Sequence, residues 1–289
     1  MKLNFHFIII RTVLVFYVLF NSTLYAQQPQ KLGKVKSSAI TEISGIIPYS
    51  YKSGYFWVHN DSGDGPFVYL VDSTASLKVK VEVEGLKFID VEDIARFQSG
   101  GKNYLILADI GNNLRHRDSL SLYIIEEPNI SIKDSSSTAK ASLIKEIKFR
   151  YKDKNRDAEA IFVDPKDNSL YLISKRDFES ILFRLPIDFK DSETHVLEPL
   201  MTFPFTFATA ADISTDGKYI VVKNLMNIYI WERDGNQCIT EAMSKIAKTI
   251  PYVIEPQGEA ICFDLNNRFL YTISERPFGL DSYLYKYEF

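Results

Sequence analysis

The chain has 289 residues, of which 46% are hydrophobic and 25% are charged, with 13 glycines and 11 prolines. These proportions exclude a disordered, collagen-like or low-complexity protein and allow a sizeable buried core. Aromatic residues make up 13% of the chain and favour strands over helices, and the net charge of -3 lacks the basic excess that nucleic-acid binding requires.

The first 26 residues have the pattern of a secretory signal peptide. Lys2 precedes an apolar run over residues 5–20, and the small residue Ala26 ends the segment before a polar stretch. Arg11 interrupts the run, which leaves fewer than the ~18 uncharged apolar residues that a membrane anchor needs. We therefore expect an exported protein, periplasmic or extracellular, whose mature form is one domain over residues 27–289 with a net charge of -5.

A short motif recurs five times along the mature chain, at intervals of roughly 50 residues. Each copy places one residue, usually small or acidic, two positions before an isoleucine; these residues are Ser44, Glu92, Glu159, Ala211 and Glu259. Two apolar segments follow each copy, as in YFWVHN at 55–60 and FVYLVD at 67–72. Alternating apolar segments bounded by turn residues are typical of half-buried antiparallel strands.

A less regular fourth strand follows in several units, at residues 77–84, 143–149 and 196–203. Five four-stranded antiparallel units predict an all-β fold, a five-bladed β-propeller, with a six-bladed ring as the alternative. The last unit ends on its third strand, so we expect a strand within residues 31–38 to complete that blade and close the ring. The Ser-rich stretch at 126–140 is expected to be an exposed loop.

The two cysteines, Cys238 and Cys262, lie in apolar, strand-like runs. An oxidising compartment permits a disulfide between them, and two separately buried thiols are the alternative. Without a CxxC spacing they do not indicate a zinc site.

The inner strand of each blade lines the central channel, and alternate residues of a strand share a face. We therefore expect carboxylates and a hydroxyl to converge at the channel mouth, from Ser44, Asp90, Glu92, Asp157, Glu159 and Glu259. Converging like charges repel, and a divalent cation, Ca²⁺ in preference to Mg²⁺, would offset that repulsion. Protonation, ordered water or pairing with a basic side chain are the alternatives. The isoleucines at 46, 94, 161, 213 and 261 are expected to plug the channel below.

The turns after the second strand of each blade lie at the same end as these carboxylates. They supply candidate catalytic residues: His59 as a general base, Asp61 and Asp109 to order water or add ligands, and Arg176 and Arg276 to hold an anion. Ordinary charged hairpin turns are the alternative.

Several of these motifs resemble a family of exported bacterial β-propeller proteins that has no settled activity. The resemblance covers nearly the whole mature chain and rests on WVHNDSGD (57–64), DVEDIA (90–95), ADIGNN (108–113), DAEAIFVDP (157–165), ISKR (173–176), AADIS (210–214) and QGEAI (257–261). It implies the propeller fold and export. Members of that family more usually carry Asp at the position of Asn113.

The inner-strand positions are also similar to those of the calcium-activated nucleotidases, or apyrases. Those enzymes are five-bladed propellers whose inner strands offer Ser and Glu side chains to a central Ca²⁺. Four residues match that ring, namely Ser44, Glu92, Glu159 and Glu259, whereas Ala211 stands where a hydroxyl is expected. This similarity implies a metal-dependent phosphoanhydride hydrolase.

These observations together predict an exported, monomeric propeller with a divalent cation at the channel mouth. The predicted activity is hydrolysis of a phosphorylated or other anionic small molecule. The alternative is a non-enzymatic propeller that binds a protein or glycan partner through the same rim. Neither nucleic acid nor a stable membrane span is expected.

Overall fold

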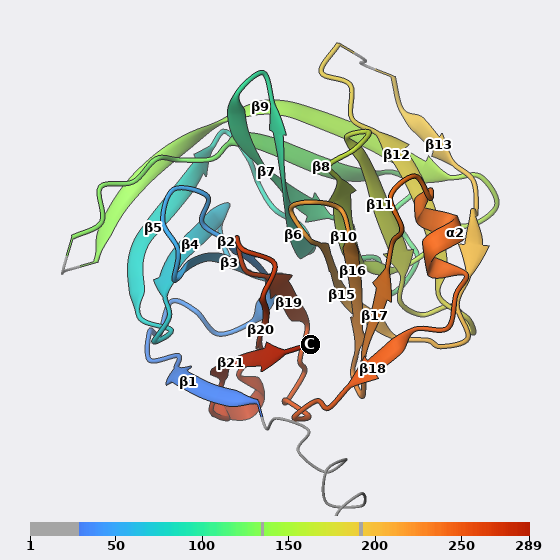
Figure 1. The fold of residues 1–289 in the computed structure, drawn as a ribbon. Coiled ribbons are helices and arrows are strands. Elements are labelled where there is room, and N and C mark those ends of the chain that lie inside the picture. The colour runs from blue at the N-terminus through green and yellow to red at the C-terminus, as the bar shows by residue number, and fades with distance from the viewer. Residues whose placement is uncertain (1–28, 134–135, 191–192) are drawn as a thin grey trace, which may run out of the picture.

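The computed structural model describes residues 29–133, 136–190 and 193–289, and its regular elements are almost all β-strands (Figure 1). The predicted signal peptide lies outside the described residues. Within them the helices are one short α-helix, α2 (Ile239–Met243), and the 3-10 turn η1 (Pro277–Gly279). No helix in the described ranges is long and apolar enough to cross a membrane.

The strands form five antiparallel units of four, each a propeller blade. Blade 1 contains β2 (Ile43–Pro48), β3 (Tyr55–Asn60), β4 (Phe67–Asp72) and β5 (Leu77–Glu84). Blade 2 contains β6 (Val91–Ser99), β7 (Lys102–Asp109), β8 (Leu120–Glu126) and β9 (Ser137–Tyr151). Blade 3 contains β10 (Ala158–Asp164), β11 (Ser169–Ser174), β12 (Ile181–Pro186) and β14 (Met201–Thr202). Blade 4 contains β15 (Ala208–Ile213), β16 (Tyr219–Asn224), β17 (Ile228–Glu232) and β18 (Lys248–Ile250).

Blade 5 combines the two ends of the described chain. It contains β19 (Ala260–Phe263), β20 (Phe269–Ile273), β21 (Tyr283–Glu288) and, from the N-terminal side, β1 (Gln30–Lys34). β1 pairs antiparallel with β21, and Figure 1 shows the blue strand beside the red one. The predicted closure of the ring by an N-terminal strand is therefore confirmed.

The innermost strands pack in a closed ring. β2 packs on β6, β6 on β10, β10 on β15, β15 on β19, and β19 returns to β2. Buried apolar side chains form four clusters between neighbouring blades. The five-bladed prediction is confirmed, and no place is left in this ring for a sixth blade.

The outer strands depart from the expected pattern at two places. The first residues of β9 pair in parallel with β5, so the end of the expected 126–140 loop is a strand that joins blades 1 and 2. The expected fourth strand of blade 3 is divided around Pro199 into β13 (His195–Leu197), which pairs with β9, and β14, which pairs with β12. Proline has no backbone N–H to donate to a ladder, which explains the break.

The two cysteines are free. Cys238 is exposed and caps the N-terminus of α2, so the strand expected around it is wrong. Cys262 is buried in β19, as the separate-thiol interpretation expects. The disulfide does not form in this structure.

Closure of the ring generates a stability prediction at Gly33 in β1. A Cβ atom at this position would overlap the backbone of Thr74 in blade 1, so Gly33→Ala must displace β1 from its place. We expect Gly33→Ala to lower the free energy of unfolding by about 1–3 kcal/mol in urea denaturation. Gly235→Ala is the matched control, because a Cβ there meets open space. Equal stability of the two variants would show that β1 does not dock as described.

Candidate cation site at the channel mouth

A β-bulge at the start of the inner strands aims the side chains of the mouth. The ladder register shifts between Ile43 and Gly45, between Val91 and Asp93, and at the equivalent places in β10 and β15. The residues inside these shifts are Ser44, Glu92, Glu159 and Thr209. In blade 5, Glu259 directly precedes the first residue of β19. A bulge inserts one extra residue and re-aims its side chain, which breaks the strict alternation along the strand.

The bulges also explain why the isoleucines do not plug the channel. Because each bulged residue leaves the alternation, the isoleucine two positions later need not share its face. Ile46 and Ile94 belong to one hydrophobic cluster, and Ile161, Ile213 and Ile261 belong to three others between different blades. The expected isoleucine plug is therefore wrong.

In blade 4 the residue at the bulge is Thr209, two positions before the predicted Ala211. The Thr209 hydroxyl donates to the Gly258 carbonyl at 3.1 Å, as the Ser44 hydroxyl donates to the Glu92 carbonyl at 2.7 Å. Ala211 instead pairs with Val222 and packs between blades. The alanines of this strand fit either register equally well, so the sequence alone did not reveal the shift.

The structure brings most of the expected carboxylates together. Oxygens of Asp61, Asp90 and Glu92 lie within 4.8 Å of one another, and so do oxygens of Glu92, Asp157 and Glu159. Glu92 is 1% exposed and belongs to both groups, so it lies at the centre of the acidic mouth.

Lys175 neutralises the other side of this mouth. Its ammonium pairs with Glu159 and lies 2.9 Å from a carboxylate oxygen of Glu259. Although burial opposes the charge, these two carboxylates raise the pKa of Lys175 above its usual value, so it stays protonated. Pairing with a basic side chain, one of the alternatives open at the sequence level, therefore occurs at Glu159 and Glu259.

Asp61, Asp90 and Glu92 have no such partner: within the described residues, none of the three forms a salt bridge. Burial, together with the neighbouring Asp90, raises the pKa of Asp61 to about 8. Burial and the Glu159 carboxylate raise the pKa of Glu92 well above its usual value. Asp61 Oδ1 is buried and has no hydrogen-bond partner among the described residues. This half of the mouth is short of positive charge.

Asp109, Asp157 and their arginines form internal contacts around the mouth. Asp109 is fully buried, accepts the Ile89 amide at 2.9 Å and pairs with Arg117 at 2.7 Å. Asp157 accepts the Asn112 amide at 2.8 Å and pairs with the Nε atom of Arg176 at 2.6 Å. Both carboxylates are thereby held in place by groups of the protein.

Arg276 and His59 form contacts within the protein. Arg276 donates to the Ser37 carbonyl at 3.3 Å. His59 is 0% exposed, and its Nδ1 lies 3.0 Å from the Asn60 carbonyl while Nε2 faces Gly45. Burial lowers the pKa of His59 to about 4, so the imidazole is neutral at physiological pH.

A second buried lysine adjoins the mouth. Lys223 is fully buried, donates to the Gly258 carbonyl and lies 4.7 Å from the ring centroid of Tyr252. Burial lowers the pKa of Lys223 to about 8, and burial raises the pKa of nearby Glu255 to about 7. The burial of Lys223 depends on the loop at 251–258 folding over it, so the sequence alone does not reveal this buried lysine.

Comparison with known proteins adds little to this geometry. No known protein family matches the sequence, and no curated protein matches it. Among solved structures, a crystal structure of a nidogen/laminin complex is similar over 81% of this chain and 72% of that chain, with 8% sequence identity and a TM-score of 0.47. The propeller assignment therefore rests on the strand pairing, and neither family resemblance gains support.

The acidic mouth predicts that the metal-free protein loses stability as the pH rises from 6.5 to 8. Glu275 follows β20, and burial and the neighbouring Glu259 raise its pKa to about 9. Between pH 6.5 and 8, Glu275 and Asp61, whose pKa is about 8, keep protons that the unfolded chain has lost. Folding then takes up protons, so each such group lowers the free energy of unfolding by up to about 1.4 kcal/mol per pH unit. Thermal melts in EDTA should show this fall, and Asp61→Asn should reduce its slope. A stability that rises over this range would contradict the prediction.

Proposed function

We propose that this protein binds a divalent cation at the channel mouth, Ca²⁺ in preference to Mg²⁺, through Asp61, Asp90 and Glu92. Support comes from three carboxylates within 4.8 Å of one another that form no salt bridge among the described residues. Carboxylate oxygens are the ligands that Ca²⁺ prefers, and Ca²⁺ tolerates irregular geometry better than Mg²⁺. The buried, unpartnered Oδ1 atom of Asp61 is the observation that carries the proposal.

The proposed cation lies off the propeller axis. Lys175 already pairs with Glu159 and Glu259, so a cation centred among all the inner-strand glutamates would meet its ammonium group. Ser44 donates its hydroxyl proton to the Glu92 carbonyl and adds no charge. The cation is therefore assigned to the side of blades 1 and 2.

Hydrolysis of a phosphorylated or other anionic small molecule is the activity that we propose with this site, in an exported protein. Arg176 uses Nε to pair with Asp157, and its side chain is 40% exposed, so its terminal nitrogens can reach an anion.

Calcium titration tests the proposal. Wild-type protein should bind one Ca²⁺ in isothermal titration calorimetry, and Glu92→Gln should weaken binding by at least about tenfold, because removing one carboxylate removes a ligand and a charge. Glu84→Gln is the control, since Glu84 is exposed and pairs with Lys140 outside the mouth. Any Ca²⁺-dependent turnover on a phosphoester and phosphoanhydride panel should be lost in Glu92→Gln.

Two results would contradict these proposals separately. Wild-type protein that binds no Ca²⁺ at millimolar concentration overturns the cation site. Protein that binds Ca²⁺ but turns over none of the panel overturns hydrolysis and leaves the cation site standing.

A second candidate function, partner binding through the rim, is favoured by exposed apolar side chains around the acidic mouth. They lie in loops at this end of the blades: Ile89, Leu114, Phe178, Phe207, Met226, Ile254, Phe278 and Leu280. Phe207 and Phe278 have φ angles of 56° and 55°, a region that costs energy for a bulky residue. Exposed apolar groups around an acidic centre match a peptide segment that carries aromatic or aliphatic residues and a lysine or arginine.

Selection from a random peptide library tests this second function. Selected peptides should combine a basic residue with apolar neighbours, and Phe178→Ser with Phe278→Ser should weaken their binding by at least about tenfold. Ile246→Ser is the matched control, because Ile246 is 100% exposed on the outer side of blade 4, next to β18. Peptides without basic residues, or equal binding by the double variant, would contradict this function.

A further inference from the structure

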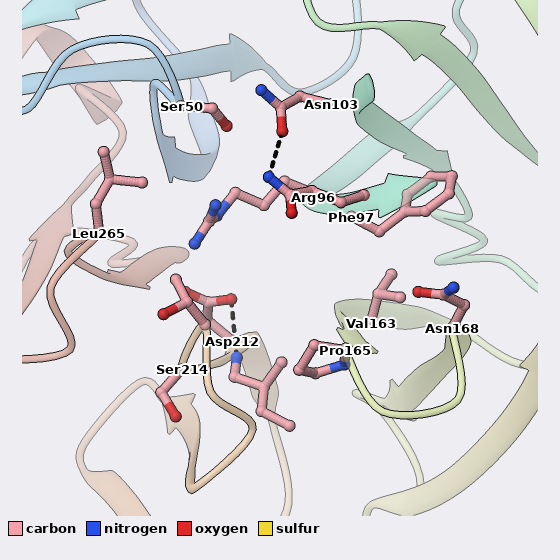
Figure 2. Close-up of a pocket in the computed structure, with 13 residues that line it drawn as sticks. Ser50, Arg96, Phe97, Asn103, Val163, Pro165, Asn168, Asp212, Ser214 and Leu265 are labelled. Atoms are coloured by element: carbon pink, nitrogen blue, oxygen red, sulfur yellow. Dashed lines mark hydrogen bonds between the residues drawn. The ribbon is translucent and has the colours of Figure 1, made fainter. Parts of the chain in front are cut away.

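A cavity of about 480 Å³ opens at the end of the channel opposite the acidic mouth. Figure 2 shows residues that line it. All five blades contribute to its lining. The turns between the first two strands supply Ser50, Asn168, Thr215 and Leu265 from blades 1, 3, 4 and 5, and the end of β6 supplies Gln98 from blade 2. The cavity therefore lies on the propeller axis. Its volume falls in the range of small-molecule binding sites.

Arg96 is the cation of this cavity. It lies on the inner strand β6, and Figure 2 shows its side chain reaching into the cavity from one side. The guanidinium group has neither a hydrogen bond nor an ion pair within the described ranges. By contrast, Arg117, Arg176 and Arg233 each pair with a carboxylate. All five N–H donors of Arg96 remain available to a ligand.

Asp212 faces Arg96 across the cavity and forms no ion pair with it, although the guanidinium charge favours the ionised form of this carboxyl group (Figure 2). Its two oxygens accept the backbone amides of Ile213 and Phe263, each at 2.8 Å, and the residue is only 7% exposed. The carboxylate is thus held by the backbone of two blades. Burial raises the pKa of Asp212 to about 7, so above that pH its negative charge disfavours a doubly charged anion in the same cavity.

The remaining residues that line the cavity include both polar and apolar side chains. Asn103 and Asn168 offer neutral hydrogen-bonding groups, whereas Val163 and Leu265 offer apolar surface. Such a lining suits a ligand with one charged head and a partly apolar body. A carboxylate head matches the planar fork of a guanidinium group, which donates two parallel hydrogen bonds to it.

We propose that this cavity binds a small organic monocarboxylate, with its carboxylate held by Arg96 and its body against Val163 and Leu265. The site is independent of the cation site, because it lies at the other end of the channel and contains none of the mouth carboxylates. Binding therefore requires no divalent cation.

Titration with benzoate tests this proposal. Wild-type protein in EDTA should bind benzoate saturably, with a shift of the Arg96 Nε–H resonance in ¹H–¹⁵N NMR spectra. Arg96→Gln should weaken binding by at least about tenfold, and Arg96→Lys should weaken it less, because lysine keeps the charge and loses the fork. Arg184→Gln is the matched control, since Arg184 pairs with Asp167 on the surface of blade 3. Thermal melts show whether the Arg96 variants fold.

Each outcome decides the proposal. Saturable benzoate binding that persists in Glu92→Gln and is lost in folded Arg96→Gln supports it. No saturable binding, binding unchanged in Arg96→Gln, or inorganic phosphate bound as tightly as benzoate overturns it. Because EDTA is present throughout, failure here leaves the proposed Ca²⁺ site unaffected.

Discussion

Five inner strands meet around one axis without pairing with one another, so their backbone polar groups need partners from side chains. The Asp93 carboxylate in blade 2 accepts the Ile161 amide of blade 3, and Asp212 in blade 4 accepts the Phe263 amide of blade 5, each at 2.8 Å. Unpaired buried amides are costly, which is why acidic residues are placed here despite their own desolvation. These cross-blade hydrogen bonds hold the channel walls together.

The same requirement explains the character of the two channel ends. Burial raises the pKa of Asp93 well above its usual value, so the channel wall can carry a carboxyl group without a buried charge. At the mouth, Asp61, Asp90 and Glu92 lie close together and form no salt bridge among the described residues. Lys175 compensates two glutamates, and the excess around Glu92 is what a cation would complete. At the opposite end of the channel, the charged group without an ion pair is a cation, Arg96.

The propeller itself was predictable because its signal is repeated. Five copies of one strand pattern reinforce each other, and the missing outer strand of blade 5 pointed to the N-terminal segment that pairs with β21. Convergence of Asp90, Glu92, Asp157 and Glu159 followed from the same repeat. The sequence did not predict that Thr209 occupies the bulge of blade 4. The alternation of an alanine-rich strand looks the same in either register, so the shift leaves no pattern in the sequence. Helix α2 was missed because it is a single short insertion outside the repeat.

The sequence by itself determined the all-β propeller, its five blades, its closure and the acidic character of one channel end, since each depends on residue types that recur at a fixed spacing. Only the tertiary structure decided which carboxyl groups lack a cationic partner. That depends on long, flexible side chains: Lys175 from blade 3 reaches Glu259 of blade 5, while Arg96 reaches into an open cavity and forms no ion pair with a described residue. Spacing along the chain cannot predict such pairings, because they depend on which blades face each other across the axis.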